Sequence, residues 1–377
     1  MNVPWVDLIA GARPNFMKIA PIVAALRRRA DDGEPPIGYR IVHTGQHYDD
    51  AMSGTFFEQL KIPEPDVNLQ AGSGSHATQT AAIMTRYESL LEGTRPDLCI
   101  VVGDVNSTMA CAITAQKLHV PVAHVEGGLR SGDWRMPEEI NRLTTDAISD
   151  WFFTTSEHAN QNLRKAGVEE HRIHFVGNTM IDTLLANLRN LRPASFWNDL
   201  ELGKRDYAVI TLHRPANVDS PDTLRALLDA IGAGAGGRPI IFPVHPRTAR
   251  MLERLGSLPS ELQLVAPQPY HQFIHLVKHA TVVVTDSGGL TEETTVLKVP
   301  CLTLRTTTER PETVEVGTNQ LLGHDPELLR VRLADVFAGH VKASGIPTLW
   351  DGHAGERIVS ALGEILLARA TASAQAS

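Results

Sequence analysis

The chain has 377 residues, 42% of them hydrophobic, which is enough for two domains with large apolar cores. Its formal net charge of −8 argues against a general nucleic-acid binder, and no apolar run is long enough to cross a bilayer. The three cysteines form no CxxC pair and lie in or beside apolar segments, which is typical of reduced core thiols in a cytoplasmic protein: Cys99, Cys111 and Cys301. The first residues contain no basic stretch, so we expect no signal peptide.

The first predicted strand, residues 6–10, leads into a helix that we expect to begin near Met17. Such a start places Pro21 in the first turn, where its missing N–H costs little. Arg13 and Lys18 then lie near the helix N-terminus, a position that favours anions, although both could be ordinary surface residues. The segment lacks the glycine spacing of a dinucleotide fingerprint, so we expect no nicotinamide cofactor.

The second predicted strand, residues 39–43, leads into a polar loop that contains Gln46 and His47. Residues 72–80 form a Gly/Ser-rich loop that opens a further helix, with Ser75 as its cap. The sequence of this region is compatible both with a ligand site and with a solvated loop.

Residues 98–125 predict a strand–helix–strand crossover between two parallel neighbours. Asp104 follows the first strand and Glu126 the second, each beside a glycine. Ligands of open parallel sheets bind at the carboxyl ends of the strands. Glu138, twelve residues after Glu126, is a further carboxylate, in the segment that follows the second strand. Helix caps and surface acids are the alternative, but two acids at adjacent strand ends favour a site.

A strand is predicted at residues 173–176, and we place the domain boundary before it, between residues 1–172 and residues 173–353. Apolar strands followed by polar or basic residues then recur at residues 207–212, 239–244, 262–266, 281–285 and 300–304. The sequence therefore predicts an α/β fold with two Rossmann-like doubly wound domains, whose loop edges face each other across a cleft.

The segment DSGGLTEE, residues 286–293, is the most specific local signal. Its glycines let the backbone approach a ligand, and Ser287 with the N–H groups of Gly288 and Gly289 would bind phosphate oxygens. Glu293, in the first turn of the following helix, either interacts with the helix dipole or accepts two hydroxyls of a ribose.

Basic side chains in the second domain could neutralise a diphosphate. The candidates are His213, Arg305 and Arg310, each of which follows a predicted strand or lies in the loop behind one. This chemistry points to a nucleotide diphosphate with carboxylates opposite it. No metal-ligand spacing is evident, so we expect no metal site.

Together, these motifs resemble the non-hydrolysing UDP-N-acetylglucosamine 2-epimerases. The resemblance rests on GARPNFMKIAPI, HTGQH, GDVNST, HVEGGLR, PEEINR, VGNTMID, TLHRPANVD, VHPRT, DSGGLTEE and PCLTLRTTTERPETVEVGTNQLLG, which appear in the family's order. It implies two domains of the glycosyltransferase-B (GT-B) kind, with a last helix, residues 354–377, that crosses back onto the first domain. It also implies a cytoplasmic homodimer that acts on a UDP-sugar without a cofactor and binds neither nucleic acid nor a membrane.

The resemblance assigns roles to individual residues. The family's acid–base carboxylates match Asp104, Glu126 and Glu138, and Lys18 and His213 complete the catalytic group. The residues implied to contact the UDP-sugar are Arg13, Gln46, His47, His245, Ser287, Gly288, Gly289, Glu293 and Arg310.

The chain departs from the family's pattern in two loops. Residues 213–217 read HRPAN, which lacks the glutamate that supports this loop in many members. Many bacterial members are activated by a second UDP-GlcNAc, which contacts a Gln-His pair that matches Gln46 and His47. Where such members carry a basic residue, this chain has the neutral segment 72–76. A second diphosphate needs added positive charge, so we expect weak or absent activation.

The implied reaction is the reversible C2 epimerisation of UDP-GlcNAc to UDP-ManNAc, for the synthesis of cell-surface polysaccharide precursors. No carbonyl activates the C2 hydrogen, so inversion needs either oxidation by a nicotinamide or elimination of UDP from C1. The absence of a nicotinamide fingerprint favours elimination to a 2-acetamidoglucal and re-addition, with two carboxylates as base and acid. The alternatives are a GT-B glycosyltransferase, a non-catalytic nucleotide-sugar-binding regulator, a hydrolysing epimerase, and an epimerase of another UDP-2-acetamido sugar such as a diacetamido-uronate.

Overall fold

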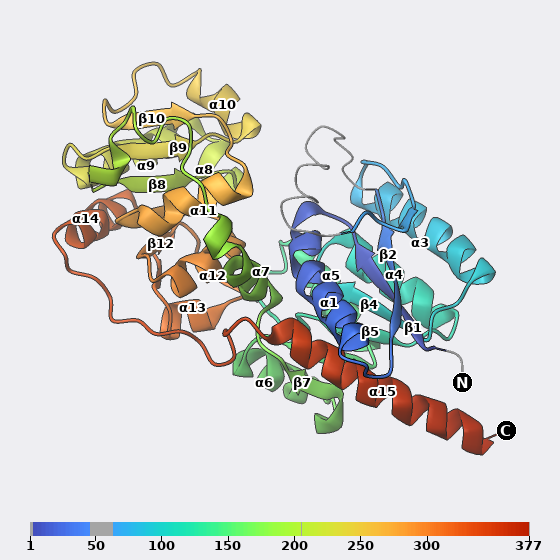
Figure 1. Cartoon of the computed structure of the whole chain (residues 1–377). Helices are drawn as coiled ribbons and strands as arrows, with labels where there is room; N and C mark the ends of the chain where they lie inside the picture. Colours follow the sequence, from blue (N-terminus) through green and yellow to red (C-terminus); the bar gives the residue numbers. More distant parts are fainter. Residues whose placement is uncertain (1–2, 46–62, 205, 377) are drawn as a thin grey trace. The chain divides into compact units, whose positions relative to one another are not determined.

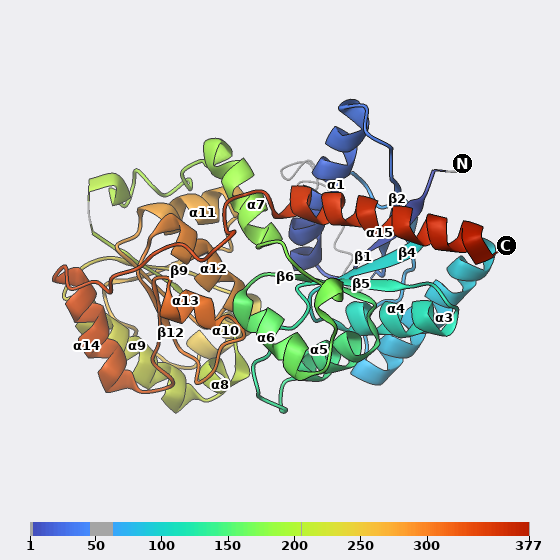
Figure 2. The same cartoon turned by 90° about the horizontal axis from the view of Figure 1, so that it is seen from below.

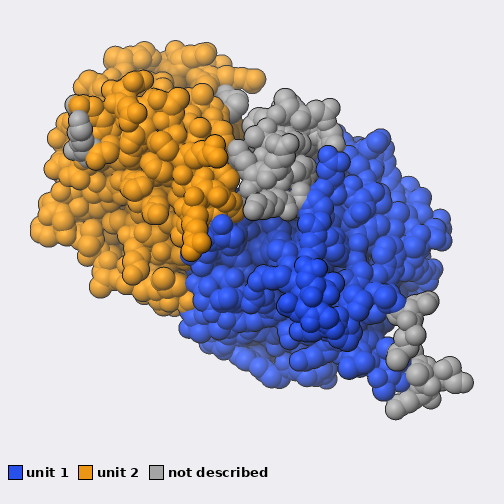
Figure 3. Space-filling view, viewed as in Figure 1, with its two compact units in different colours: residues 1–186, 348–377 blue, residues 187–347 orange. Residues whose placement is uncertain are grey.

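The computed structural model describes residues 3–45, 63–204 and 206–376. The chain divides into two compact units, with residues 1–186 and 348–377 in unit 1 and residues 187–347 in unit 2 (Figure 3). Each unit contains a parallel sheet covered by helices (Figure 1), which confirms the predicted α/β class with two Rossmann-like domains. Within the described residues, no helix is both long and apolar enough to cross a membrane.

The described part of unit 1 forms a seven-stranded parallel sheet in the order β3-β2-β1-β4-β5-β6-β7. Its strands are β1 (Trp5–Ala10), β2 (Gly38–His43), β3 (Val67–Asn68), β4 (Leu98–Val102), β5 (Val122–Val125), β6 (Trp151–Thr154) and β7 (Ile173–Phe175). Its helices are α1 (Arg13–Asp31), α3 (His76–Gly93), α4 (Asn106–Lys117), α5 (Pro137–Ile148), α6 (Glu157–Lys165), α7 (Thr179–Asn187) and α15 (Ala354–Ala376). The strand order reverses between β1 and β4, so the loops after β1, β4 and β5 lie at the edge where such sheets bind ligands.

Unit 2 repeats this architecture with six strands in the order β10-β9-β8-β11-β12-β13. Its strands are β8 (Ala208–Thr211), β9 (Ile240–Pro243), β10 (Leu262–Val265), β11 (Val282–Thr285), β12 (Cys301–Thr303) and β13 (Asn319–Leu321). Its helices are α8 (Pro215–Val218), α9 (Pro221–Ala235), α10 (Pro246–Leu252), α11 (Tyr270–His279), α12 (Gly288–Leu297), α13 (Pro311–Glu315) and α14 (Pro326–Phe337). Here the order reverses between β8 and β11.

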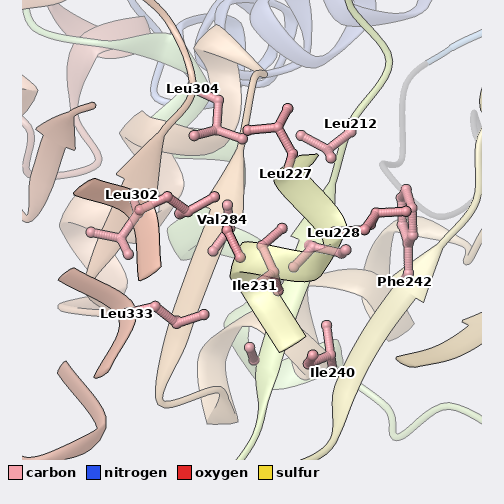
Figure 4. Packing of buried hydrophobic residues seen from close by; sticks show 14 of the residues in the cluster. Leu212, Leu227, Leu228, Ile231, Ile240, Phe242, Val284, Leu302, Leu304 and Leu333 are labelled. Atoms are coloured by element: carbon pink, nitrogen blue, oxygen red, sulfur yellow. The ribbon is translucent and has the colours of Figure 1, made fainter. Parts of the chain in front are cut away.

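Alternate residues of the unit 2 strands pack into two apolar clusters. Val282 and Val284 of β11 belong to one cluster, together with Leu227 of α9 and Leu333 of α14 (Figure 4). Val283, between the two valines, belongs to the other cluster. Both faces of the sheet are therefore buried, which explains why the strands read as continuous apolar runs.

Unit 1 extends further along the chain than the boundary expected after residue 172. Strand β7 pairs in parallel with β6, as Phe152 lies opposite Ile173, so it completes the first sheet. Helix α7 also belongs to unit 1 up to Ala186, and the chain re-enters this unit at Thr348. The pairing partner of a short strand decides its domain, and the sequence of β7 does not reveal that partner.

Helix α1 begins at Arg13 rather than near Met17, so Pro21 lies in the helix interior. Proline has no N–H to donate to the carbonyl four residues earlier, which belongs to Met17. The hydroxyl of Thr183 in α7 donates to that carbonyl oxygen over 2.6 Å. A side chain from another helix thus replaces the hydrogen bond that the proline removes.

Helix α15 returns to unit 1 and packs along α1, as Figures 1 and 2 show. Gly355 permits this contact, because a Cβ at that position would lie 2.6 Å from the carbonyl oxygen of Pro21. The carboxylate of Asp182 accepts hydrogen bonds from the N–H groups of Ala354 and Gly355 at 3.1 and 2.7 Å. This capping fixes the start of the last helix, and the predicted return of the chain is confirmed.

Candidate functional site

Glu126 lies directly after β5 in a backbone conformation that is costly for a residue with a side chain. Its φ is +69°, and its side chain is 3% exposed. Lys18 of α1 pairs with it at 2.6 Å between Nζ and Oε2. Non-glycine residues persist at positive φ only where the surroundings fix them, and such residues cluster at functional sites. The sequence predicted both residues for the site, and the structure brings them into contact.

Asp104 lies at the end of the neighbouring strand, β4, and is held from α5. Arg142 donates to Asp104 Oδ2 from Nη2 at 2.6 Å and from Nε at 3.1 Å, and the Asn141 amide donates to the Asp104 carbonyl at 2.8 Å. The Asp104 side chain is 31% exposed. Asp104 is therefore held in place and open to solvent, whereas Glu126 is enclosed.

The PEEINR motif begins α5 and presents two different carboxylates. Glu138 is half-buried, and among the described residues it has no hydrogen-bond or ion-pair partner. Glu139 is buried and accepts from the N–H groups of Ser131 and Gly132 and from Arg142 Nη1. Burial opposes ionisation of Glu139, but these donors lower its pKa below the usual value. Arg142 thus links Glu139 to the catalytic candidate Asp104, a connection that the sequence did not reveal.

His213 follows β8 in unit 2 and is oriented by a buried carboxylate. Its Nδ1 lies 2.8 Å from Oδ1 of Asp286, which is fully buried at the end of β11. Burial raises the pKa of Asp286, but the His213 side chain and the Arg214 and Asn217 donors bring it below its ordinary value. The ring of His213 is 44% exposed. With Nδ1 held by Asp286, Nε2 remains for a ligand.

Asn217 supports the loop in which the sequence lacks the family's glutamate. Its amide donates to Asp286 Oδ2 at 3.1 Å and to the Leu304 carbonyl at 3.2 Å. Its Oδ1 lies 2.8 Å from Nδ1 of His324. This buried amide ties the ends of three strands together, so the loop has a different support from the one that the motif predicted.

The predicted phosphate-binding residues lie at the start of α12. Ser287 is the N-cap of this helix, and Gly288 and Gly289 are its first residues. A Cβ at Gly288 would lie 2.4 Å from Oε1 of Glu309, so a larger residue there would displace the Glu309 carboxylate, whereas nothing lies within 4 Å of a Cβ at Gly289. The N–H groups of a helix start and its dipole favour an anion.

Two further predicted contacts are buried behind this helix start. Glu293 is 6% exposed and accepts a hydrogen bond from the Tyr270 hydroxyl at 3.0 Å. Burial raises the pKa of Glu293 to about 8. Arg310 is 4% exposed and pairs through Nε with Glu292. Tyr270 is a residue of this site that the sequence did not single out.

The remaining predicted contacts have less structural support. His245 is exposed after β9, with its ring centroid 6.2 Å from that of His213. Gln46 and His47 lie outside the described residues, as does the side chain of Arg13. Within the part of the chain that the structure describes, no group of three or more His, Cys, Asp or Glu residues could hold a metal ion.

Comparisons with known proteins identify the family of the chain. A family model described as UDP-N-acetylglucosamine 2-epimerase matches residues 29–363. The UDP-N-acetylglucosamine 2-epimerase of Methanocaldococcus jannaschii is 40% identical over 367 residues, which cover 94% of this chain and 98% of that protein. The UDP-2,3-diacetamido-2,3-dideoxy-D-glucuronate 2-epimerase of Pseudomonas aeruginosa is 37% identical and covers 95% of this chain and 99% of its own.

Solved structures give the same result. The crystal structure of the M. jannaschii UDP-GlcNAc 2-epimerase in complex with UDP-GlcNAc and UDP matches with a TM-score of 0.83 at 39% identity, over 96% of this chain and 99% of that chain. The Neisseria meningitidis UDP-GlcNAc 2-epimerase bound to UDP-GlcNAc has a TM-score of 0.83 at 27% identity, over 96% and 100% of the two chains. The chain therefore belongs to the UDP-N-acetylglucosamine 2-epimerase family.

Proposed function

We propose that this protein is an isomerase that interconverts UDP-GlcNAc and UDP-ManNAc by inverting C2 of the sugar. The observation that carries the proposal is the pair of carboxylates at neighbouring strand ends, Asp104 and Glu126, each with its own buried or half-buried cation. Membership of the epimerase family supports the assignment of acid–base chemistry to this pair. A product of this kind would serve the synthesis of cell-surface polysaccharides.

The proposed mechanism eliminates UDP and adds it back. One carboxylate takes the proton from C2, the C1–O bond breaks, and its electron pair leaves with the UDP oxygen. The C2–C1 double bond of 2-acetamidoglucal forms. A second carboxylate then delivers a proton to the opposite face of C2, while the UDP oxygen attacks C1. Asp104 and Glu126 are the proposed acid and base, with Glu138 as the third carboxylate of the group.

The groups in unit 2 are proposed to bind the UDP part. The free Nε2 of His213 and the N–H groups of Gly288 and Gly289 donate to the diphosphate, and so stabilise the charge that develops as UDP leaves. From the family's pattern, Arg13 of unit 1 is also proposed to add a positive charge to the diphosphate. Glu293, which accepts a hydrogen bond from Tyr270, is proposed to accept further hydrogen bonds from the ribose hydroxyls.

The Pseudomonas relative supports a second candidate substrate. It is named for a diacetamido-uronate, and its identity of 37% is close to the 40% of the M. jannaschii enzyme. Both reactions invert a C2 that carries an acetamido group. They share the chemistry at C2 and differ at C3 and C6, so a side-by-side assay separates them.

The test is an incubation of the pure protein with UDP-GlcNAc in deuterated buffer, followed by NMR, without added nicotinamide. Elimination requires that C2 of both UDP-GlcNAc and UDP-ManNAc acquires deuterium. Retention of the C2 proton during turnover would refute the mechanism. Release of free ManNAc would identify a hydrolysing enzyme, and turnover only with an added acceptor would identify a glycosyltransferase.

We also propose that the protein is a cytoplasmic homodimer. The three cysteines are free and buried, which suits a reducing compartment. Sedimentation equilibrium at several protein concentrations gives the oligomeric state, and a mass of one chain at all of them would contradict the dimer.

A further inference from the structure

His124 is fully buried in β5, two residues before Glu126, and both of its ring nitrogens face acceptors. Nδ1 lies 2.7 Å from Asp146 Oδ1, and Nε2 lies 2.8 Å from the carbonyl oxygen of Gly103. A carbonyl oxygen can only accept, so Nε2 must carry a proton. A neutral imidazole would then have no proton left for Nδ1.

Asp146 is held as an acceptor by other groups as well. Its Oδ2 accepts from the N–H of Gly128 at 3.0 Å and from Arg130 Nη1 at 2.6 Å. The Arg130 guanidinium and the Gly128 N–H can only donate, so they hold Asp146 as an acceptor independently of His124. An ionised carboxylate beside Nδ1 also requires a donor there, so both ring nitrogens donate.

We propose that His124 is an imidazolium and that it acts, together with Asp146, as a positioning residue for the two strand-end carboxylates. This proposal rests on the proposed epimerase function, because it gives the pair a role in that reaction. The imidazolium joins the loop after β4, through the Gly103 carbonyl, to the loop after β5, through Asp146 and the Gly128 N–H.

The backbone at both loops explains why such a connection is needed. Gly103, at φ +74°, directly precedes Asp104, and its N–H donates to the Val125 carbonyl at 3.0 Å. Glu126 has a φ of +69° and lies between His124 and Gly128 in the chain. Conformations of this kind persist only where the surroundings determine them. A charged, buried hydrogen-bond pair is directional and strong, and so suits this task.

Close packing leaves little freedom around the pair. A Cβ at Gly127 would lie 3.4 Å from Asp146 Oδ1 and 2.9 Å from Phe152, and a Cβ at Gly128 would lie 2.4 Å from the Ala159 carbonyl. The Glu126 backbone therefore cannot relax by moving toward α6. Loss of the His124 ring would instead release the Gly103 carbonyl, and with it the position of Asp104. Loss of the Asp146 charge would weaken the link from the ring to the Gly128 N–H, and with it the position of Glu126.

The charge on His124 can be measured directly by NMR of protein labelled with ¹⁵N-histidine at neutral pH. We expect one histidine with protons on both ring nitrogens that exchange slowly with water, and we expect this signal to be absent in His124→Gln. In Asp146→Asn the same histidine should keep only the proton on Nε2, because the amide offers no anionic acceptor. A wild-type His124 with a single ring proton would overturn the proposal.

Kinetics test the positioning role. His124→Gln and Asp146→Asn should lower kcat by on the order of 10²-fold, the cost of a small misplacement of catalytic groups, with KM and UDP affinity unchanged. The matched control is Asp150→Asn. Asp150 accepts from the Val122 N–H at 2.8 Å at the opposite end of β5, so this variant should keep the wild-type kcat.

The outcomes are separable. A wild-type kcat in both His124→Gln and Asp146→Asn, or an equal loss in Asp150→Asn, would overturn the positioning role. If the wild-type protein exchanges no C2 hydrogen in UDP-GlcNAc, the proposed function fails, whereas the ring protons of His124 still decide whether it is an imidazolium. If His124→Gln does not fold, as judged by circular dichroism, Asp146→Asn provides the kinetic test.

Discussion

The two strand-end carboxylates differ in their surroundings although they are neighbours in the sheet. Asp104 is 31% exposed and held by a guanidinium, whereas Glu126 is 3% exposed and paired with the Lys18 ammonium. Acid–base pairs in enzymes are typically separated in this way, because different environments assign different protonation roles. In the proposed mechanism, these different environments would let two similar side chains act differently on the two faces of C2.

Neutral replacements of these carboxylates test their roles. Asp104→Asn and Glu126→Gln keep the size of each side chain but cannot accept a proton, so the rate of C2 deuterium exchange should fall by on the order of 10² or more. Binding of UDP, measured by calorimetry, should change little. Glu157→Gln on α6 is the control, because Glu157 is 54% exposed and its partners among the described residues, Arg164 and Asn160, belong to the same helix. Wild-type exchange in either site variant would remove that residue from the mechanism.

Glu293 should make the protein less stable as the pH rises. Burial raises its pKa from 4.5 to about 8, so between these values the folded state holds a proton that the unfolded state has released. This contribution is fully present below about pH 4.5 and is lost as the pH rises through 8. Glu293→Gln is neutral throughout, so the fall in melting temperature between pH 5 and pH 8 should be smaller than in the wild type.

The same variant separates stability from binding. Glutamine can still accept the Tyr270 hydroxyl bond, but it cannot ionise when UDP binds, and only the ionised carboxylate would hold two ribose hydroxyls. We expect UDP binding to weaken by about 1–3 kcal/mol, the range for hydrogen bonds to a charged group. Unchanged UDP affinity by calorimetry would remove Glu293 from the ribose site, and an unchanged pH dependence of melting would show that it is ionised in the folded state.

At the scale of elements, α15 depends on one carboxylate for its start. Asp182 in α7 caps the helix N-terminus through two N–H groups. Asp182→Ala should cost about 1 kcal/mol of unfolding free energy, the usual value of an N-cap, and should speed amide exchange in residues 354–366. Asp182→Asn is the matched control, because its amide oxygen can still accept. Equal exchange in the alanine variant and the wild type would show that packing on α1 alone fixes the helix.

The helices and strands could be predicted from the sequence where burial produces a simple hydrophobic pattern. The parallel strands are covered on both faces, so Leu98–Val102 and Val282–Thr285 read as apolar runs of strand length. The start of α1 was not predictable in the same way. At the interior Pro21, Thr183 supplies the replacement bond to the Met17 carbonyl, and this partner lies 166 residues after Met17 in the sequence.

The site residues at the strand ends could be predicted from the sequence, but the residues that support them could not. Asp104, Glu126 and Ser287 follow apolar runs directly, so local pattern finds them. Their supporting partners are distant in the chain, since Arg142 lies 38 residues after Asp104 and Tyr270 lies 23 residues before Glu293. Such pairs come together only through the fold, and no spacing rule in one sequence reveals them.

At the scale of the whole molecule, the two units divide the proposed chemistry. The carboxylates lie in unit 1, whereas the helix start at Gly288 and the oriented His213 lie in unit 2. Each unit has its own apolar cores. Variants of the unit 1 carboxylates should therefore slow exchange at C2 with little change in UDP affinity, whereas variants of the unit 2 groups should weaken UDP binding as well as slow exchange.

Activation by a second substrate molecule is a property of the whole molecule. We expect the loop before α3 to limit this activation. Residues 62–85 contain no lysine or arginine. The next cation, Arg86, donates to the carbonyl oxygens of Leu69 and Gln70, and His76 lies 3.1 Å from the Asn106 amide. A second diphosphate beside the first would find little positive charge here, and like charges a few ångströms apart repel strongly away from bulk water.

We therefore expect weak or absent activation by UDP-GlcNAc. Starting from pure UDP-ManNAc, the reverse reaction should begin without a lag, and the forward reaction should follow a hyperbolic dependence on substrate concentration. Stopped assays by NMR at early times measure the first, and initial rates measure the second. Thr78→Lys, which adds a cation in the first turn of α3, directly after this loop, provides the comparison, because it should favour a second anion. A lag in the wild type that trace UDP-GlcNAc abolishes, together with sigmoidal forward kinetics, would show that positive charge from elsewhere in the chain serves a second site.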